Sequence, residues 1–236
     1  MTFKELINKG YFGFNYENGE NWYTVLLICI AAISICSYFL GSINFSVIIS
    51  KDRYGKDIRD SGSGNAGATN MLRTYGKKAA ILTFLGDIAK TAVAVILARL
   101  VIGYTGAFIA GFFCILGHAY PIFFKFKGGK GVVCISAMCL FTNPVVFLIM
   151  LFIFLTVLFA FRMVSLASIM IMITYPFVLF NVVGPGPHII IATICALFVV
   201  YLHRENIKRI YNHKESTISF GKNKDKKDKK SYKDED

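Results

Sequence analysis

Charged residues are scarce in this sequence and are spread unevenly along it. Asp, Glu, Lys and Arg make up 17% of the 236 residues, and 55% are hydrophobic; soluble domains have roughly 25% charged residues. Whole windows, such as 22–49 and 132–161, contain no charge. A charged side chain at the centre of a bilayer costs about 2.5–3.5 kcal/mol on insertion scales. The shortage of charge therefore argues against a soluble domain and predicts an all-α integral membrane protein.

Cysteine motifs are also missing. The six cysteines lie in apolar runs, and none has the Cys-x-x-Cys or Cys–His spacing of metal and redox sites. Cysteines in such runs behave as small buried hydrophobes. We therefore expect neither disulfides nor structural zinc. The cysteines are Cys29, Cys36, Cys114, Cys134, Cys139 and Cys195.

A cleavable signal peptide is not evident either. Residues 1–21 are polar, and the first apolar run, 22–40, is long enough to span a bilayer. The last segment, "GKNKDKKDKKSYKDED", mixes charges and has almost no apolar residues, which predicts disorder. The expected organisation is a polar N-terminal extension (1–21), a membrane domain (22–210) and a charged, disordered tail (211–236).

The formal net charge of +12 does not by itself indicate a nucleic-acid partner. Cationic loops hold a membrane protein in orientation and face anionic lipid. We therefore expect contact with membrane lipid and no binding of nucleic acid.

Seven apolar runs can be separated along the chain. The doubtful separator is Asn143-Pro144, which is either a tight turn or a kink in one long helix. Two helices place every basic separator on one side, whereas one helix would export the Lys-rich tail against the positive-inside rule. We therefore predict seven transmembrane helices, with the N-terminus outside and the C-terminus in the cytoplasm. The runs are about 22–49, 79–102, 106–124, 132–142, 145–161, 164–183 and 188–202.

This topology brings four polar segments together at the cytoplasmic face: 57–78, 125–131, 162–168 and 203–209. The first contains "SGSGNAGATN" (61–70). Glycines leave backbone N–H groups uncovered, which suits an anion, and arginine can donate two bonds to a phosphate at once. The alternatives are a flexible connector or small residues for close helix packing. The polar side chains favour phosphate binding: Arg59, Ser63, Asn65, Thr69, Asn70 and Arg73.

The second segment, "FKFKGGKG" (124–131), resembles a P-loop only superficially, because it lacks GxxxxGK[ST] and no strand precedes it. Nucleotide hydrolysis is therefore not expected. Lysines around a glycine pair at the start of a helix still suit an anion. A positive-inside anchor is an equally good interpretation of this segment alone.

The third and fourth segments supply hydroxyl, amide and imidazole groups. Ser165 and Ser168 lie one helical turn apart, although helix serines often bond their own backbone. His203 and Asn206 share a face at i, i+3, where they are candidates for binding or deprotonating a hydroxyl.

Three further polar residues lie within the apolar runs. Asp87 and Lys90 are one turn apart and should pair with each other or with the polar loop, since isolated charges are costly there. We expect His118 to pack near the cytoplasmic end of its span rather than to act in catalysis.

Six motifs in order resemble the bacterial acyl-phosphate-dependent glycerol-3-phosphate acyltransferases of phospholipid synthesis. They are "GSINFS" (41–46), "DIRDSGSGNAGATN" (57–70) with Arg73, "DIAK" (87–90), "GHAYPIFFKFKGGKG" (117–131), "SLAS" (165–168) and "HRENIKRI" (203–210). Asn44 and Ser46, and Thr91 after Lys90, depart from the family's usual residues at positions that we assign to helix packing.

The resemblance implies acyl transfer from acyl phosphate to the 1-hydroxyl of glycerol 3-phosphate, which gives lysophosphatidic acid and phosphate. It also implies seven helices in the bacterial cytoplasmic membrane, no metal, no cofactor, and a soluble partner enzyme that makes acyl phosphate. On this basis we predict catalytic roles for Ser63, Arg73, Lys130, His203 and Asn206. We predict substrate contacts for Arg59, Gly62, Gly64, Asn65, Thr69, Asn70, Lys127, Gly128, Gly129, Ser165 and Ser168.

Two rival functions have distinguishable signatures. A transporter of an organic phosphate anion would show internal repeats and broken helices near mid-membrane; the sequence has no evident repeat, and its polar motifs gather on one side. An acyltransferase with a His-x4-Asp dyad is excluded, because no histidine is followed by Asp at the required spacing.

Overall fold

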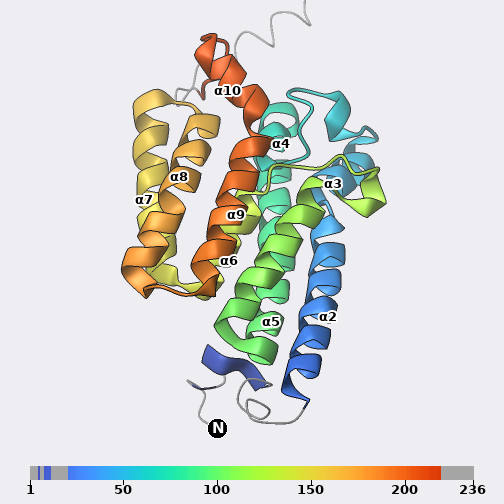
Figure 1. The fold of residues 1–236 in the computed structure, drawn as a ribbon. Coiled ribbons are helices and arrows are strands. Elements are labelled where there is room, and N and C mark those ends of the chain that lie inside the picture. Colours follow the sequence, from blue (N-terminus) through green and yellow to red (C-terminus); the bar gives the residue numbers. More distant parts are fainter. Residues whose placement is uncertain (1–4, 6–7, 12–20, 219–236) are drawn as a thin grey trace, which may run out of the picture.

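The computed structural model describes residue 5, residues 8–11 and residues 21–218, and within these ranges the regular structure is entirely helical. The helices run almost end to end, joined by short connections (Figure 1). The N-terminal helices are α2 (Trp22–Ser42), α3 (Phe45–Tyr54), η1 (Ile58–Asp60), α4 (Ala68–Tyr75) and α5 (Lys77–Ala119). The remaining ones are η2 (Ile122–Phe124), α6 (Val132–Thr142), α7 (Pro144–Phe161), α8 (Val164–Val183), α9 (Pro187–Leu202) and α10 (Arg204–Tyr211).

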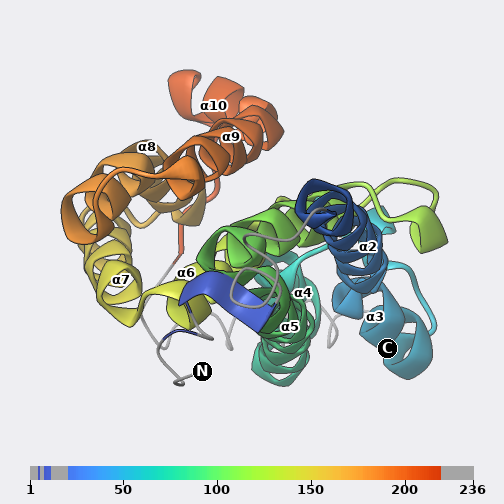
Figure 2. The same cartoon turned by 60° about the horizontal axis from the view of Figure 1, so that its bottom comes forward.

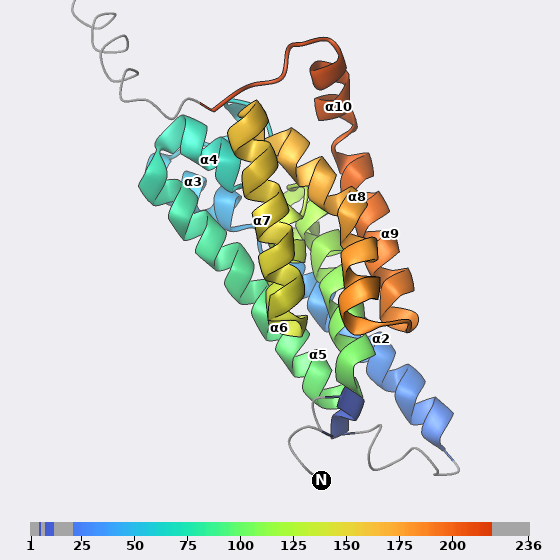
Figure 3. The same ribbon diagram turned by 90° about the vertical axis from the view of Figure 1, so that its left-hand side faces the viewer.

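Helix α5 is a hairpin of two helical halves. Ile102 and Gly103 leave the helical region, and Gly103 has φ +74°, so the expected break near 103–105 is confirmed. The hydroxyl of Thr91 lies 3.4 Å from the sulfur of Cys114, and Asp87 lies 3.5 Å from His118. Residues that come earlier in the first half therefore pair with residues that come later in the second half. The two halves of α5 are antiparallel, as Figure 3 shows.

Asn143-Pro144 is a turn between two helices. The Asn143 side chain accepts hydrogen bonds from the N–H groups of Val145 and Val146 at 3.0 and 3.1 Å, and Pro144 occupies the first helical turn of α7. This is a favourable helix start, because proline there gives up an N–H that would have no helical partner. The two-helix interpretation of residues 132–161 is therefore confirmed.

Several helices are suited to a bilayer. Among the residues that the structure describes, four helical stretches can cross one by length and composition, and five can if α9 and α10, bent by 56°, form one span. Helix α6 is short, with 11 residues. Large apolar side chains point outward, among them Phe152 (71% exposed) and Phe177 (70% exposed), as a lipid environment favours. The count of seven crossings remains a prediction.

The helix arrangement places the polar segments at one end of the molecule. Helices α2 and α3 lie on one side of α5, and α7, α8 and α9 lie on the other (Figure 2). Figure 1 shows α3, α4 and α10 at the upper end and the reversal of α5 at the lower end. Residues from all four polar segments line one cavity. Their predicted convergence is therefore confirmed.

Candidate active site

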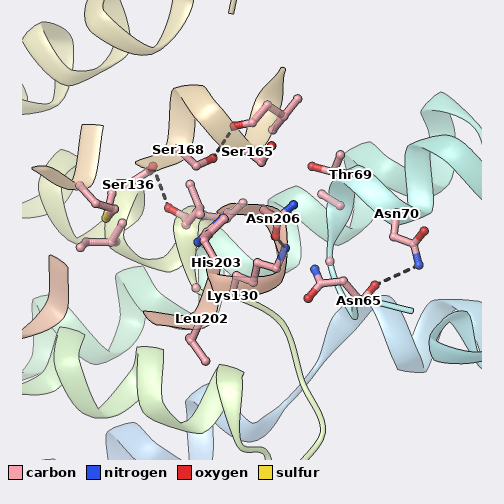
Figure 4. A pocket seen from close by; sticks show the side chains of 18 of the residues that line it. Asn65, Thr69, Asn70, Lys130, Ser136, Ser165, Ser168, Leu202, His203 and Asn206 are labelled. Carbon is pink, nitrogen blue, oxygen red and sulfur yellow. Dashed lines mark hydrogen bonds between the residues drawn. The ribbon is translucent and has the colours of Figure 1, made fainter. Parts of the chain in front are cut away.

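A cavity of about 890 Å³ opens at the polar end of the helices. Its rim carries amide, hydroxyl, imidazole and cationic groups, and its deeper part is lined by apolar side chains of α6, α7 and α8. Figure 4 shows Lys130, His203 and Asn206 grouped together, with Ser168 on one side and Thr69 on the other. A site of this kind suits a molecule with a charged head and an apolar chain.

The loop before α4 is held in one shape by the buried side chain of Asn70. Its oxygen accepts from the Ser63 N–H at 2.9 Å, and its amide group donates to the carbonyls of Ile58, Ser61 and Asn65 at 3.2, 2.9 and 3.1 Å. Gly62 has φ +60°, and a Cβ there would collide with the Asn70 oxygen. Asn70 thus uses both its donors and its acceptor to shape the loop, which is not a flexible connector.

The start of α4 faces the cavity and suits an anion. The first N–H groups of a helix have no acceptor within the helix, and Gly67 at the N-cap has no side chain to satisfy them. Ala68 and Thr69 line the cavity, and Arg73 joins them from the last turn of the same helix. Backbone donors, the positive end of the helix dipole and a guanidinium therefore meet at one place.

Lys130 supplies a second cation just before α6. Its ammonium group donates a hydrogen bond to the side-chain oxygen of Asn206. Burial, followed by repulsion from Arg209, lowers the pKa of Lys130 to about 8, although Glu215 opposes the decrease. The side chain is therefore mostly charged near neutral pH and loses its charge under mildly alkaline conditions.

His203 lies at the bend between α9 and α10 and is 3% exposed. Its Nδ1 lies 2.7 Å from the Val199 carbonyl, which can only accept, so Nδ1 carries the proton and Nε2 is the acceptor atom. Burial lowers the pKa of His203 to about 4, so the ring is neutral at pH 7. His203 is the N-cap of α10 and Asn206 lies in the first turn of this helix, so the predicted i, i+3 spacing is kept, and both side chains line the cavity.

Residues 212–218 return to the site after α10. The Glu215 carboxylate accepts hydrogen bonds from Asn206 at 2.9 Å, Ser165 at 3.0 Å and Arg209 at 2.8 Å, and the Ile218 N–H donates to the Arg162 carbonyl at 2.8 Å. Burial opposes ionisation of Glu215, but these hydrogen bonds lower its pKa overall. The sequence places Glu215 in a separate charged tail from residue 211, whereas in the structure Glu215, Ser216 and Ile218 line the cavity. Residues 219–236 lie outside the described residues.

Similarity to known proteins identifies the family of this chain. The family described as glycerol-3-phosphate acyltransferase matches residues 31–213. The chain belongs to the glycerol-3-phosphate acyltransferase family. Curated acyltransferases of this name from Exiguobacterium sibiricum and Bacillus subtilis are 44% and 40% identical over 205 and 191 residues, which are 86% and 81% of this chain and 99% and 98% of theirs.

Two solved structures agree with this membership. They are crystal structures of PlsY (YgiH), an integral membrane glycerol 3-phosphate acyltransferase, in its glycerol 3-phosphate form and its lysophosphatidic acid form. The first is 36% identical with a TM-score of 0.77, and the second is 34% identical with a TM-score of 0.74. Both matches cover 80% of this chain, and they cover 96% and 95% of the solved chains. The protein is therefore a multi-pass membrane acyltransferase.

Most of the predicted site residues of the acyltransferase meet in the cavity. Those that line it are Gly62, Ser63, Gly64, Asn65, Thr69, Asn70, Arg73, Lys130, Ser165, Ser168, His203 and Asn206. The Ser168 hydroxyl donates to the Val164 carbonyl at 2.8 Å, as helix serines often do. Among the lining residues of the C-terminal segments that sequence reasoning missed are two charged ones with contacts in the site, Arg209 and Glu215.

Four residues predicted to contact substrate lie outside the cavity lining. Arg59 instead donates to the Asp57 carboxylate at 2.9 and 2.7 Å and to the carbonyls of Phe124 and Lys127 at 2.6 and 2.9 Å. It therefore joins the first two polar segments. The other three residues are Lys127, Gly128 and Gly129.

The glycine pair packs beneath the cavity rather than lining it. The N–H groups of Gly128 and Gly129 donate to the carbonyls of Ala119 and His118, both at 3.0 Å. A Cβ at Gly129 would collide with the His118 ring. The glycines thus allow the loop to lie directly on the end of α5, and this contact sets the position of Lys130.

Asp87 and Lys90 pair with each other, as one of the two sequence alternatives expected. The Lys90 ammonium lies 2.8 Å from the Asp87 carboxylate and 3.0 Å from His118 Nδ1. It also donates to the carbonyls of Gly41 and Ile43 at 3.0 and 2.7 Å. The cluster joins both halves of α5 to the end of α2, and Asp87 and His118 reach the cavity lining. In the ranges that the structure describes, no group of three His, Cys, Asp or Glu is placed to hold a metal.

Proposed function

We propose that this acyltransferase moves a fatty acyl group from acyl phosphate to the 1-hydroxyl of sn-glycerol 3-phosphate. The products are 1-acyl-glycerol 3-phosphate and phosphate. The observation that carries the proposal is the division of one cavity into a cationic, N–H-rich rim and an apolar interior. Both proposed substrates carry phosphate, and one also carries a long alkyl chain.

The residues have distinct roles in the proposed reaction. The start of α4, Arg73 and Lys130 hold the phosphates, while Nε2 of His203 accepts a hydrogen bond from the attacking hydroxyl. Lys130 and Glu215 fix the amide of Asn206 from its two ends, so that this side chain can position the glycerol. Such preorganised groups lower the barrier without rearranging during the reaction.

The chemical step is a direct substitution at the acyl carbon. The hydroxyl oxygen attacks the carbonyl carbon and forms the ester bond, the anhydride C–O bond breaks, and phosphate leaves with the bonding electrons. The hydroxyl proton passes either to His203 or to a phosphate oxygen. Because acyl phosphate already has a good leaving group, positioning and charge stabilisation are the main tasks of the protein.

The assay that tests the proposal uses purified protein in detergent with palmitoyl phosphate and glycerol 3-phosphate. Lysophosphatidic acid and phosphate should form in equal amounts without coenzyme A. Absence of product, together with glycerol 3-phosphate counterflow in liposomes, would indicate a transporter.

The proposal includes an orientation in the bacterial cytoplasmic membrane. The chain crosses it seven times, with the N-terminus outside and the polar end in the cytoplasm, where a soluble enzyme supplies acyl phosphate. The basic residues at this end support the orientation. A membrane-impermeant thiol reagent should therefore label a cysteine introduced at Lys214 only after the membrane is opened. Labelling in intact cells would contradict it.

The pH dependence should report the charge of Lys130. Because burial lowers its pKa to about 8, the cation is present below this pH and is lost above it, and kcat/KM for glycerol 3-phosphate should fall accordingly. Glu215→Gln removes a charge that raises this pKa, so the fall should begin at lower pH. Lys130→Arg, whose side chain stays protonated, should abolish the alkaline fall. If kcat/KM of Lys130→Arg decreases at alkaline pH as in wild type, the decrease is caused by the titration of another group.

Two substitutions, His203→Gln and His203→Ala, show whether His203 positions the attacking hydroxyl or removes its proton. A neutral imidazole whose pKa is about 4 is a weak base, so we expect a phosphate oxygen to take the proton. His203→Gln, which keeps a hydrogen-bonding side chain, should retain kcat within about tenfold of wild type, whereas His203→Ala should lose about a hundredfold. Equal losses in both variants would identify His203 as the base.

A further inference from the structure

The loop that leads from α5 to Lys130 exposes large apolar side chains. This aromatic loop, residues 120–127, includes η2, and its Ile122, Phe123 and Phe126 are 43%, 58% and 55% exposed. Figure 2 shows the loop, in yellow-green, at the edge of the molecule beside α2. Three large apolar side chains close together in a short loop are unfavourable in water and mark an interaction surface.

The aromatic loop continues the outward-facing surface of α2. Ile35 and Phe39 are both exposed and lie four residues apart, so they share one face of α2. The ring centroids of Phe39 and Phe123 are 6.1 Å apart, and the Tyr38 hydroxyl donates to the Tyr120 carbonyl at 2.9 Å. Helix α2 belongs to a stretch that can cross a bilayer, so lipid covers this face. The apolar surface of the loop is therefore continuous with a surface in contact with lipid.

Two lysines give the aromatic loop a cationic edge. Lys125 and Lys127 are exposed and flank Phe126 in the sequence. Lysines beside exposed aromatic side chains are typical of segments in the headgroup region, because the rings reach the acyl boundary while the ammonium groups stay at the level of the lipid phosphates. Positive charge at this level favours anionic lipid. The composition of the loop therefore fits a membrane surface better than water.

The backbone fixes the outward position of these side chains. Lys125 and Phe126 have φ +58° and +56°, a left-handed conformation that is unfavourable for residues with a Cβ. The Phe126 N–H donates to the Pro121 carbonyl at 2.9 Å, and Arg59 donates to the Lys127 carbonyl at 2.9 Å. An unfavourable conformation that its surroundings hold in place suggests a functional requirement. Here it turns the chain so that a ring and two lysines face outward.

We propose that the aromatic loop inserts into the headgroup region of the leaflet at the polar end of the molecule and binds anionic phospholipid there. This surface is separate from the cavity, and the inference does not depend on the proposed reaction. It also assigns both sequence interpretations of residues 124–131, each to its own part. The first residues of this segment anchor the loop to the membrane, and the last ones place Lys130 in the cavity.

Fluorescence quenching in lipid nanodiscs tests the insertion. The chain has one tryptophan, Trp22, so Phe126→Trp is introduced in a Trp22→Phe background. Tyr211→Trp in the same background is the matched control, because Tyr211 is 83% exposed at the end of α10. Phosphatidylcholine brominated near the top of its acyl chains should quench the fluorescence of Phe126→Trp by about half or more and that of Tyr211→Trp hardly at all. Acrylamide in the water should show the opposite order.

Strong quenching of Phe126→Trp by acrylamide, with no effect of brominated lipid, would overturn the proposal and point to a protein partner for the aromatic loop. If Phe126→Trp does not fold, Phe123→Trp decides by the same measurement. Neither outcome depends on acyl transfer. A failure of the proposed function would show separately, as absence of lysophosphatidic acid from an enzyme whose loop is inserted.

The headgroup preference is tested with the same tryptophan variant. Nanodiscs contain equal amounts of phosphatidylglycerol and phosphatidylcholine, and only one of the two lipids is brominated. Quenching should be about twofold stronger when phosphatidylglycerol carries the bromine. The added substitutions Lys125→Gln and Lys127→Gln should remove this difference while the total quenching remains. Equal quenching by the two brominated lipids before these lysines are replaced would overturn the binding of anionic lipid.

Discussion

Replacing Lys130 with alanine should lower kcat/KM for glycerol 3-phosphate by about a hundredfold to a thousandfold. The ammonium group contacts Asn206 and lines the cavity together with Arg73 and the start of α4. Removal of one preorganised donor to a developing negative charge has an effect of this size in other enzymes. The loss should be measured with the concentrations of both substrates varied. If Lys130 binds a phosphate in the ground state, the substitution raises KM; if Lys130 stabilises only the transition state, it lowers kcat.

Lys127→Ala is the matched control for this prediction. Lys127 lies three residues away in the same basic loop, but it does not line the cavity, and only its backbone carbonyl holds Arg59. We therefore expect kcat/KM of Lys127→Ala to stay within about threefold of wild type, as for surface substitutions generally. Similar losses in the two variants would show that the loop acts through its overall charge and not through Lys130.

Replacing Asn70 with aspartate should abolish most of the activity although the shape of the side chain hardly changes. The amide nitrogen of Asn70 donates to three carbonyls, and an aspartate oxygen in its place would repel all three. Each buried carbonyl left without a donor costs about 1–3 kcal/mol, so the loop 58–67 should open. We expect kcat/KM to fall by more than about a hundredfold, with the far-UV circular dichroism unchanged because the helices remain.

Asn212→Asp makes the same chemical change at an exposed residue of the same end of the molecule and should leave kcat/KM unaltered. Both substitutions replace one amide nitrogen with an oxygen and add one negative charge, so the two variants differ only in where the change is made. Retention of full activity in Asn70→Asp would mean that the shape of the loop does not limit phosphate binding.

The charge pattern of the sequence predicted the arrangement of the site better than any single motif did. Seven apolar runs, separated alternately by basic and uncharged segments, required that residues 57–78, 125–131, 162–168 and 203–209 meet at one end. The cavity lining confirms this. The turn at Asn143 was predictable for the same reason, because a continuous helix would have reversed the positions of every later charge.

The contacts of Arg59 could not be predicted from the residues near it in the sequence. An arginine beside a glycine-rich loop is typical of phosphate binding, yet the partners of Arg59 are Asp57 and carbonyls of Phe124 and Lys127, more than 60 residues further along the chain. A sequence does not show which backbone carbonyls will lack a donor in the fold. A carboxylate two residues before the arginine was the available signal.

Glu215 was missed for a different reason. The composition of residues 211–236 as a whole predicts disorder, and an average over the segment conceals a single residue with a fixed role. Its donors come from α8 and α10, so the contacts depend on the chain returning over the cavity. Only the three-dimensional arrangement reveals that return.

The return of residues 212–218 also has a consequence for biosynthesis. Glu215 and Ile218 are fixed only after every described helix has been made, and they contact residues on α8, α10 and the turn before α8. A nascent chain still passing through the ribosome therefore inserts all its apolar segments before its cavity is complete. This side of the cavity is thus completed late in translation, when residues 212–218 become available to bond with α8 and α10.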